Sequence, residues 1–92
     1  MIPPELGRLR EQIEKLDREL IELIAKRVGL AREVGTEKRA AGLPTLDPKR
    51  EAAVVRQAVV LAREAGIECD DEIRQIFWLL IGLSRRAQAH DQ

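Results

Sequence analysis

The stretch from Leu6 to Lys38 carries an apolar repeat that restricts this chain to a helical fold. Apolar residues recur there at alternating steps of three and four, namely Leu6, Leu9, Ile13, Leu16, Leu20, Leu23, Leu30 and Val34. That spacing places them on one face of a helix. The pattern runs on until Gly42 and Pro44, so it predicts one helix of roughly 35 to 40 residues, about 55 Å long.

Two shorter helices are expected after the long one. Asp47 followed by Pro48 is a typical helix start, and Gly66 is a typical helix end. A third helix is expected to begin at Asp70 or Asp71. The predicted apolar faces are Val54, Val55, Ala58, Leu61, Ala62 and Ala65 in the second helix, and Ile73, Ile76, Phe77, Leu80 and Ile81 in the third. Without strand signals or repeats, the predicted fold class is all-α, with one long helix and two shorter helices.

The lengths of these helices suggest that one chain cannot bury its own apolar faces. Two short helices of about 30 Å each, placed end to end, match the long helix but cover it from one side only. An intertwined helical homodimer, in which two long helices pack together with the short ones wrapped around them, would bury every face. The alternative is a monomeric three-helix bundle with a protruding first helix.

The composition narrows the possible functions. Ninety-two residues suit one domain over residues 1–92, and sixteen basic residues balance sixteen acidic ones. Without net charge or a basic tail, we expect neither nucleic acid nor membrane as a partner. No stretch is long enough to span a bilayer, and the first residues lack the pattern of a signal peptide. Cys69 is the only cysteine, so no disulfide can form within the chain, which favours a cytoplasmic location.

Arg27 interrupts the apolar repeat at the position between Leu23 and Leu30. An arginine there must meet an anion or pair with a carboxylate, because an unpaired buried charge is costly. Lys38 follows eleven residues later, almost a whole number of turns, and points the same way about 16 Å along the axis. We therefore expect a shallow trough with a cation at each end, suited to a small molecule with several anionic groups. Alternatively, Arg27 pairs with a core carboxylate and Lys38 is solvated.

Other polar residues stand near the apolar faces of the shorter helices. Asp47, Arg50 and Glu51 lie one turn before the apolar stripe of the second helix. The helix dipole disfavours an arginine in a first turn, so Arg50 is expected to have another use. Ser84 and Gln88 extend the apolar face of the third helix and suit a pocket rim. The simpler explanations are capping and solvation for the first group and an exposed helix end for the second.

Arg10 lies seventeen residues before Arg27, about 25 Å away along the helix and turned to a different side. It cannot share a pocket with Arg27 of its own chain, but in an antiparallel dimer it could reach the partner's pocket. The simpler alternative is a surface pair with Glu14. No metal-binding or nucleophile motif is visible, so an enzyme of this kind would act by positioning and electrostatics.

The ordered set of these residues resembles the all-helical class of chorismate mutases. The motifs that carry the resemblance are LREQI at 9–13, AKR at 25–27, VGTEK at 34–38, PTLDPKRE at 44–51 and the segment 84–88. Each motif is weak by itself, but the ordered set covers nearly the whole chain. The eight residues concerned are Arg10, Arg27, Lys38, Asp47, Arg50, Glu51, Ser84 and Gln88.

The resemblance implies a cofactor-free Claisen rearrangement of chorismate to prephenate in an intertwined homodimer. It implies that Arg27 and the partner subunit's Arg10 hold the two substrate carboxylates. Lys38 and Gln88 would hydrogen-bond the ether oxygen. The reaction would belong to phenylalanine and tyrosine biosynthesis, and a complex with another enzyme of that pathway is possible.

The same resemblance implies that Asp47 and Glu51 meet the ring hydroxyl, and that Arg50 and Ser84 complete the polar wall. Arg85 departs from the pattern, since a small or apolar residue is expected after Ser84. Isochorismate-pyruvate lyase, which shares the fold and the cations, is an alternative, but such lyases lack acids matching Asp47 and Glu51. A non-enzymatic helical dimerisation module is the other alternative, and it leaves the cation within the apolar repeat unexplained.

Overall fold

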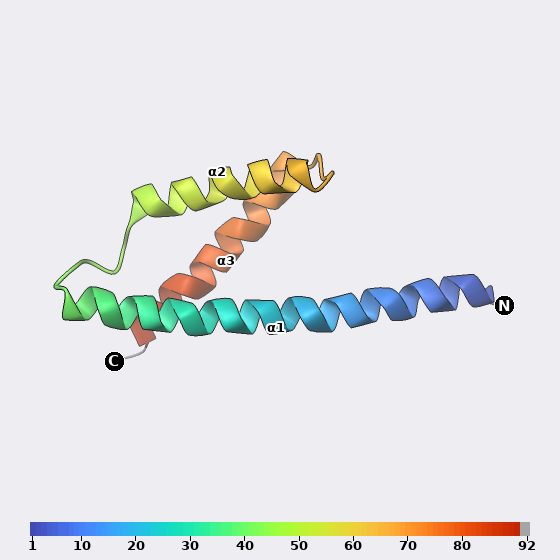
Figure 1. Ribbon diagram of the computed structural model, residues 1–92, viewed down its shortest axis with the longest axis horizontal. Helices are drawn as coiled ribbons and strands as arrows, with labels where there is room; N and C mark the ends of the chain where they lie inside the picture. The colour runs from blue at the N-terminus through green and yellow to red at the C-terminus, as the bar shows by residue number, and fades with distance from the viewer. Residues whose placement is uncertain (91–92) are drawn as a thin grey trace.

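The computed structural model describes residues 1–90, which form three α-helices: α1 (Pro4–Ala40), α2 (Pro48–Glu64) and α3 (Asp70–His90) (Figure 1). No strand occurs within these residues. The predicted all-α class with one long helix and two shorter helices is confirmed. None of the three helices combines the length and hydropathy needed to cross a membrane.

The helix ends follow from local chemistry. Asp47 caps α2 as predicted, because its Oδ1 accepts a hydrogen bond from the backbone N–H of Arg50 at 3.1 Å. Gly42 follows α1 with φ +69° and Gly66 follows α2 with φ +88°. Residues with a Cβ rarely adopt such angles, so these two glycines allow the chain to leave each helix and turn.

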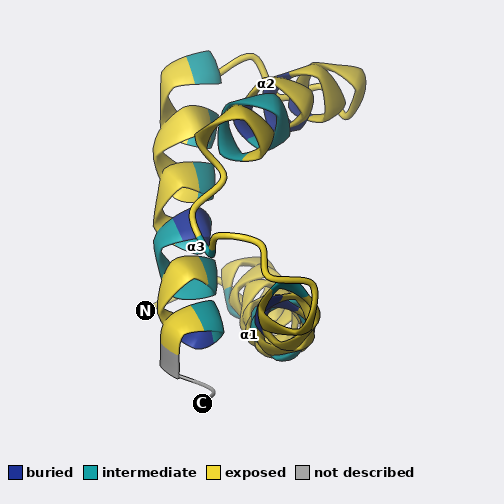
Figure 2. Ribbon diagram, turned by 90° about the vertical axis from the view of Figure 1, so that its left-hand side faces the viewer, coloured by how far each residue is buried: buried dark blue, intermediate teal, exposed yellow. Residues whose placement is uncertain are grey.

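α3 crosses between the other two helices and joins them (Figure 1). α1 and α2 each pack against α3, whereas the backbones of α1 and α2 do not approach each other. Figure 2 shows that the less exposed side of α3 faces α1 and α2. The buried apolar residues are Ala31, Val55, Ala58, Val59, Ala62, Ile81 and Ala87. Only the C-terminal half of α1 contributes to this set, because α3 reaches α1 there.

The apolar repeat of α1 is largely uncovered within this chain. The exposed fractions of its eight apolar residues run from 38% at Leu6 to 62% at Leu30. Five of the eight, Leu6 to Leu20, lie on the N-terminal half of α1, which extends beyond both shorter helices (Figure 1). The molecule is accordingly elongated, with extents of 60, 27 and 17 Å. An apolar stripe of this length is unusual on the surface of a monomer.

Three positions on the shorter helices differ from the sequence prediction. Leu61, expected on the apolar face of α2, is 53% exposed, Ala65 from the same predicted face is also exposed, and Ile76 on α3 is 50% exposed. Val59 is buried instead. Within this chain α2 packs against α3 alone, so only a narrow stripe at steps of three and four is covered. That stripe consists of Val55, Ala58, Val59 and Ala62.

Candidate active site

A pocket of about 310 Å³ lies between the C-terminal half of α1, the start of α2 and the end of α3. Its walls consist of Arg27, Leu30, Ala31, Val34, Lys38, Asp47, Arg50, Glu51, Val54, Ile81, Ser84 and Gln88. Seven of the eight residues singled out in the sequence therefore share one pocket, and Arg10 is the exception. An apolar wall with a few polar groups at its ends is the usual build of a small-molecule site.

Arg27 defines one end of the pocket, where it contacts α3. Its Nη1 donates to Ser84 Oγ at 2.5 Å and to the backbone oxygen of Leu80 at 3.4 Å. Ser84 Oγ in turn donates to Leu80 O at 3.1 Å. No carboxylate in the described part of the chain pairs with Arg27, so the alternative of a core ion pair does not hold. Its charge has only neutral partners, and both hydrogen bonds use Nη1, which leaves Nε and Nη2 for an anionic ligand.

Lys38 and Gln88 define the other end. Lys38 Nζ donates to Gln88 Oε1 at 2.9 Å and to Thr45 O at 2.7 Å. An ammonium group can only donate, so the amide oxygen of Gln88 faces it and the amide NH₂ is directed elsewhere. The ammonium also keeps one N–H unused in these two bonds. Two neighbouring side chains can thus both donate to a single acceptor atom at this end of the pocket.

The last turns of α3 are held against α1 by two contacts that the sequence did not reveal. Gly35 is buried, and a Cβ added there would lie 2.8 Å from Gln88 Cα and 2.9 Å from Gln88 O. Arg39 Nη1 donates to the same Gln88 O at 2.7 Å. The available signal was the position of Gly35 on the helix face of Ala31 and Lys38, where a small residue permits close approach of another helix.

The two acidic residues of the pocket are held in different ways. Asp47 is engaged as the cap of α2. Glu51 accepts two hydrogen bonds from Arg85 on α3: Arg85 Nε to Glu51 Oε2 at 2.8 Å, and Arg85 Nη2 to Glu51 Oε1. The hydrogen bond from Arg85 holds the pKa of the Glu51 carboxyl below its ordinary value, burial opposes this, and the charges of Arg85 and Lys38 assist it. The unexpected arginine after Ser84 therefore has a partner at the site.

The two remaining predicted residues have no partner for their charge within the described residues. Arg50 is exposed and lines the pocket through the first turn of α2. Arg10 is exposed on the N-terminal half of α1, away from the pocket of its own chain. Its alternative role does not appear, because no ion pair with Glu14 forms within residues 1–90; nearby, Arg8 pairs with Glu5 instead.

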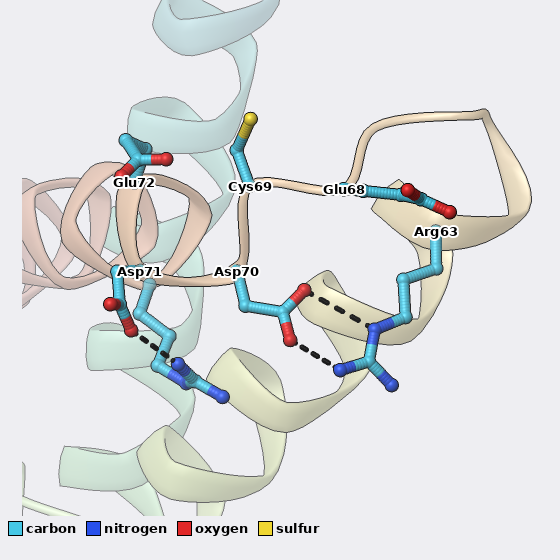
Figure 3. Close-up of a pocket in the computed structure, with 7 residues that line it drawn as sticks. Arg63, Glu68, Cys69, Asp70, Asp71 and Glu72 are labelled. Atoms are coloured by element: carbon cyan, nitrogen blue, oxygen red, sulfur yellow. Dashed lines mark hydrogen bonds and ion pairs between the residues drawn. The ribbon is translucent and has the colours of Figure 1, made fainter.

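A second hollow, of about 640 Å³, lies at the link between α2 and α3 (Figure 3). Both of its arginines are paired, since Arg63 pairs with Asp70 and Arg74 pairs with Asp71 at 2.8 Å, and Glu68 and Glu72 also line it. Cys69 extends to the side opposite the Asp70 carboxylate in Figure 3. No group of residues in the described part of the chain could hold a metal ion. The carboxylates of this hollow carry no feature that matches the site predicted from the sequence.

Comparison with known proteins identifies one family. Residues 9–89 match the sequence model of the family described as chorismate mutase type II. The chorismate mutase of Methanocaldococcus jannaschii is 31% identical over 84 residues, which cover 91% of this chain and 84% of that protein.

A longer relative and a solved structure agree with this match. The T-protein of Haemophilus influenzae is 47% identical over 62 residues, which cover 67% of this chain but 16% of that protein. The chain thus spans about a sixth of the length of this relative. A conserved hypothetical protein from Pyrococcus furiosus has a structure with a TM-score of 0.76 and 32% identity, covering 95% of this chain and 99% of that one.

Proposed function

The chain belongs to the chorismate mutase type II family, and we propose that it converts chorismate to prephenate without a cofactor. The observation that carries the proposal is the contact between Lys38 Nζ and Gln88 Oε1 at 2.9 Å, opposite Arg27 in one pocket. This arrangement offers donors to an ether oxygen at one end and a guanidinium to a carboxylate at the other.

The substrate is a dianion, which suits the cationic ends of the pocket. Arg27 binds one carboxylate through the nitrogens that Ser84 and α3 do not use, because a guanidinium matches a carboxylate in shape and charge. The partner subunit's Arg10 binds the other carboxylate. Holding both carboxylates folds the enolpyruvyl arm over the ring and removes much of the entropy cost of reaching the reactive conformation.

The rearrangement needs no proton transfer from the protein. The C–O bond of the ether breaks while a C–C bond forms, all within the substrate, and negative charge grows on the ether oxygen in the transition state. Lys38 and the amide NH₂ of Gln88 stabilise the transition state, which carries this charge, more strongly than they stabilise the bound substrate. This difference lowers the activation barrier. A rate enhancement of about a million-fold requires roughly 8 kcal/mol, within reach of two such donors plus conformational restriction.

The remaining residues complete recognition of the ring. Glu51 accepts a hydrogen bond from the ring hydroxyl, with Asp47 beside it at the start of α2. Arg50 adds positive charge to the wall. Ser84 contributes by holding the Arg27 guanidinium, which the 2.5 Å contact supports. In this scheme Lys38, Gln88, Arg27 and Glu51 are the catalytic residues, and the rest bind substrate.

The functional unit that we infer is an intertwined homodimer. The exposed apolar repeat of α1 supports it, because each of eight large side chains would contribute on the order of 1 kcal/mol when covered by a second copy. The gap in the site supports it as well, since Arg10 lies on the half of α1 that its own chain leaves bare. A protruding monomer would leave both features unexplained.

We also propose a metabolic and cellular setting for the reaction. Production of prephenate fits a place in phenylalanine and tyrosine biosynthesis. The greater length of the T-protein relative fits a chain that works beside another enzyme of that pathway. The single unpaired Cys69 fits the cytoplasm.

A cofactor-free assay of the purified protein with chorismate and, separately, isochorismate tests the proposal. Prephenate formed from chorismate is the expected result. Release of pyruvate from isochorismate alone would make the protein a lyase and overturn the proposed reaction. A folded dimer that converts neither compound would instead be a dimerisation module.

A further inference from the structure

Arg85 on α3 donates two parallel hydrogen bonds to the carboxylate of Glu51 on α2. Arg85 Nε lies 2.8 Å from Glu51 Oε2, and Arg85 Nη2 contacts Glu51 Oε1. The Glu51 side chain is 13% exposed and that of Arg85 is 48% exposed. The acid is thus covered within the site while the arginine reaches it from the outer side. This fork geometry fixes both the position and the plane of a carboxylate.

Among the arginine–carboxylate pairs of the described residues, only this one includes a residue that lines the pocket. The pairs of Arg8 and Arg74 join residues three apart on one exposed helix face, and the forked pair of Arg63 with Asp70 lies outside the pocket, at the link between α2 and α3. Arg85 and Glu51 are 34 residues apart and connect α3 to α2. Glu51 lines the pocket, whereas Arg85 does not. Arg85 therefore contacts a pocket acid without itself lining the pocket.

Resting on the proposed function, we propose that Arg85 is a positioning residue that fixes the Glu51 carboxylate for the ring hydroxyl of the substrate. A carboxylate offers about four acceptor positions, of which Arg85 occupies two. Glu51 can therefore keep the arginine and accept the substrate hydroxyl at the same time. Without Arg85, the side chain of Glu51 would sample several rotamers, and part of the binding energy would be spent on ordering it.

The charges around Glu51 make the ionised form the relevant one. Arg85 on α3 and Lys38 on α1 lower the pKa of Glu51, whereas the Asp47 carboxylate at the start of α2 raises it. Arg27 and Arg50 line the same pocket. Arg85 is the largest cause of the lowered pKa of Glu51, so its removal would raise that pKa. Glu51 must be ionised to accept the substrate hydroxyl with either of its oxygens. In Arg85→Gln, the fall in activity at acidic pH should therefore begin at a higher pH than in the unmodified protein.

Five variants separate this role from a general effect of charge. Arg85→Gln removes the two hydrogen bonds to Glu51 together with one positive charge. Arg86→Gln is the control, because it removes one positive charge from the next residue of α3, which is exposed. Glu51→Gln and the double variant with Arg85→Gln complete a double-mutant cycle. Arg85→Lys keeps the charge but cannot form the fork. Circular dichroism and sizing confirm that each variant is folded and assembled.

We expect Arg85→Gln to raise KM for chorismate by about three- to tenfold with a smaller change in kcat, whereas Arg86→Gln changes neither. Arg85→Lys should give an intermediate KM. In the Glu51→Gln background, Arg85→Gln should have little further effect. In ¹³C NMR titrations, the pKa of the Glu51 carboxyl should rise in Arg85→Gln.

Additive effects in the double variant would overturn the inference, because Arg85 would then act on the substrate directly. An unchanged pKa of Glu51 in Arg85→Gln would also overturn it. Failure of the proposed function is recognised separately, since the unmodified protein would then not convert chorismate at all, and the inference would fall with it.

Discussion

Gly35 of α1 and Gln88 of α3 approach so closely that a Cβ on Gly35 would stand 2.8 Å from the Cα of Gln88. Real Cβ atoms essentially never come this close to a backbone atom. The glycine therefore sets the separation of the two helices at the residue that would donate to the ether oxygen. Lys38, one turn further along α1, contacts the side chain of that same Gln88 at 2.9 Å.

Gly35→Ala should push the end of α3 away from α1 and separate Gln88 from Lys38. We expect kcat to fall by about 10- to 100-fold, because small displacements of a catalytic donor are costly, while the dimer stays folded. Steady-state kinetics with chorismate and sizing check this. An unchanged kcat would show that the close approach does not set the catalytic geometry.

Gly82→Ala is the matched control on α3, since a Cβ added at Gly82 meets nothing within 4 Å in this chain. Alanine lowers the entropy cost of forming a helix, so the variant should be more stable by roughly 0.5–1 kcal/mol with unchanged kcat/KM. Urea unfolding and the same kinetic assay measure both quantities. A loss of activity here would indicate that any substitution in this part of α3 disturbs the site.

Local pattern predicted much of this molecule. Apolar residues at steps of three and four predict α1, and the spacing of eleven residues predicts that Arg27 and Lys38 share one face. Both predictions depend only on helix geometry. The cap at Asp47 was equally local. In each case the physical cause lies within a few neighbouring residues or in the period of a single helix.

Contacts between helices could not be read in the same way. Glu51 and Arg85 lie on different helices, and no spacing rule connects them. From the sequence, Gly35 within α1 only indicates a weaker helix. Its role in the close approach of α3 is visible only once the position of Gln88 is known. The spacing predicts Leu61 on a buried face, but α3 does not cover that part of α2. These features depend on how the helices cross, which the period of each helix does not determine.

Gln88→Glu should make activity depend steeply on acid. At neutral pH the introduced carboxyl group would be ionised, and the ammonium of Lys38 beside it would lower its pKa further. An ionised group cannot donate to the ether oxygen, so we expect a loss of about 100-fold or more at pH 7, with partial recovery as the pH falls. A pH–rate profile measures this. Full activity at neutral pH would refute the donor role of Gln88.

Arg27→Ala should remove turnover almost completely while leaving the helices folded. In the proposed function this guanidinium binds a substrate carboxylate, and its partners in the chain are the neutral atoms Ser84 Oγ and Leu80 O. Losing it leaves no buried charge unpaired, so stability should change little. We expect kcat/KM to fall by about 100-fold or more, with the circular dichroism spectrum unchanged. Retained activity would remove Arg27 from the site.

Mixed dimers test whether Arg10 is supplied by the partner subunit. Dimers of Arg10→Ala alone and of Arg27→Ala alone should both be inactive, because every site lacks one arginine. If the two variants carry different affinity tags and are coexpressed, tandem purification isolates the mixed dimer. One of its two sites would combine Arg27 of one chain with Arg10 of the other, and we expect about half of the wild-type activity per dimer.

An inactive mixed dimer would mean that Arg10 serves its own chain, which its distance from the pocket along α1 contradicts. An active Arg10→Ala homodimer would mean that the second carboxylate has another ligand, for which exposed Arg50 at the pocket wall is a candidate.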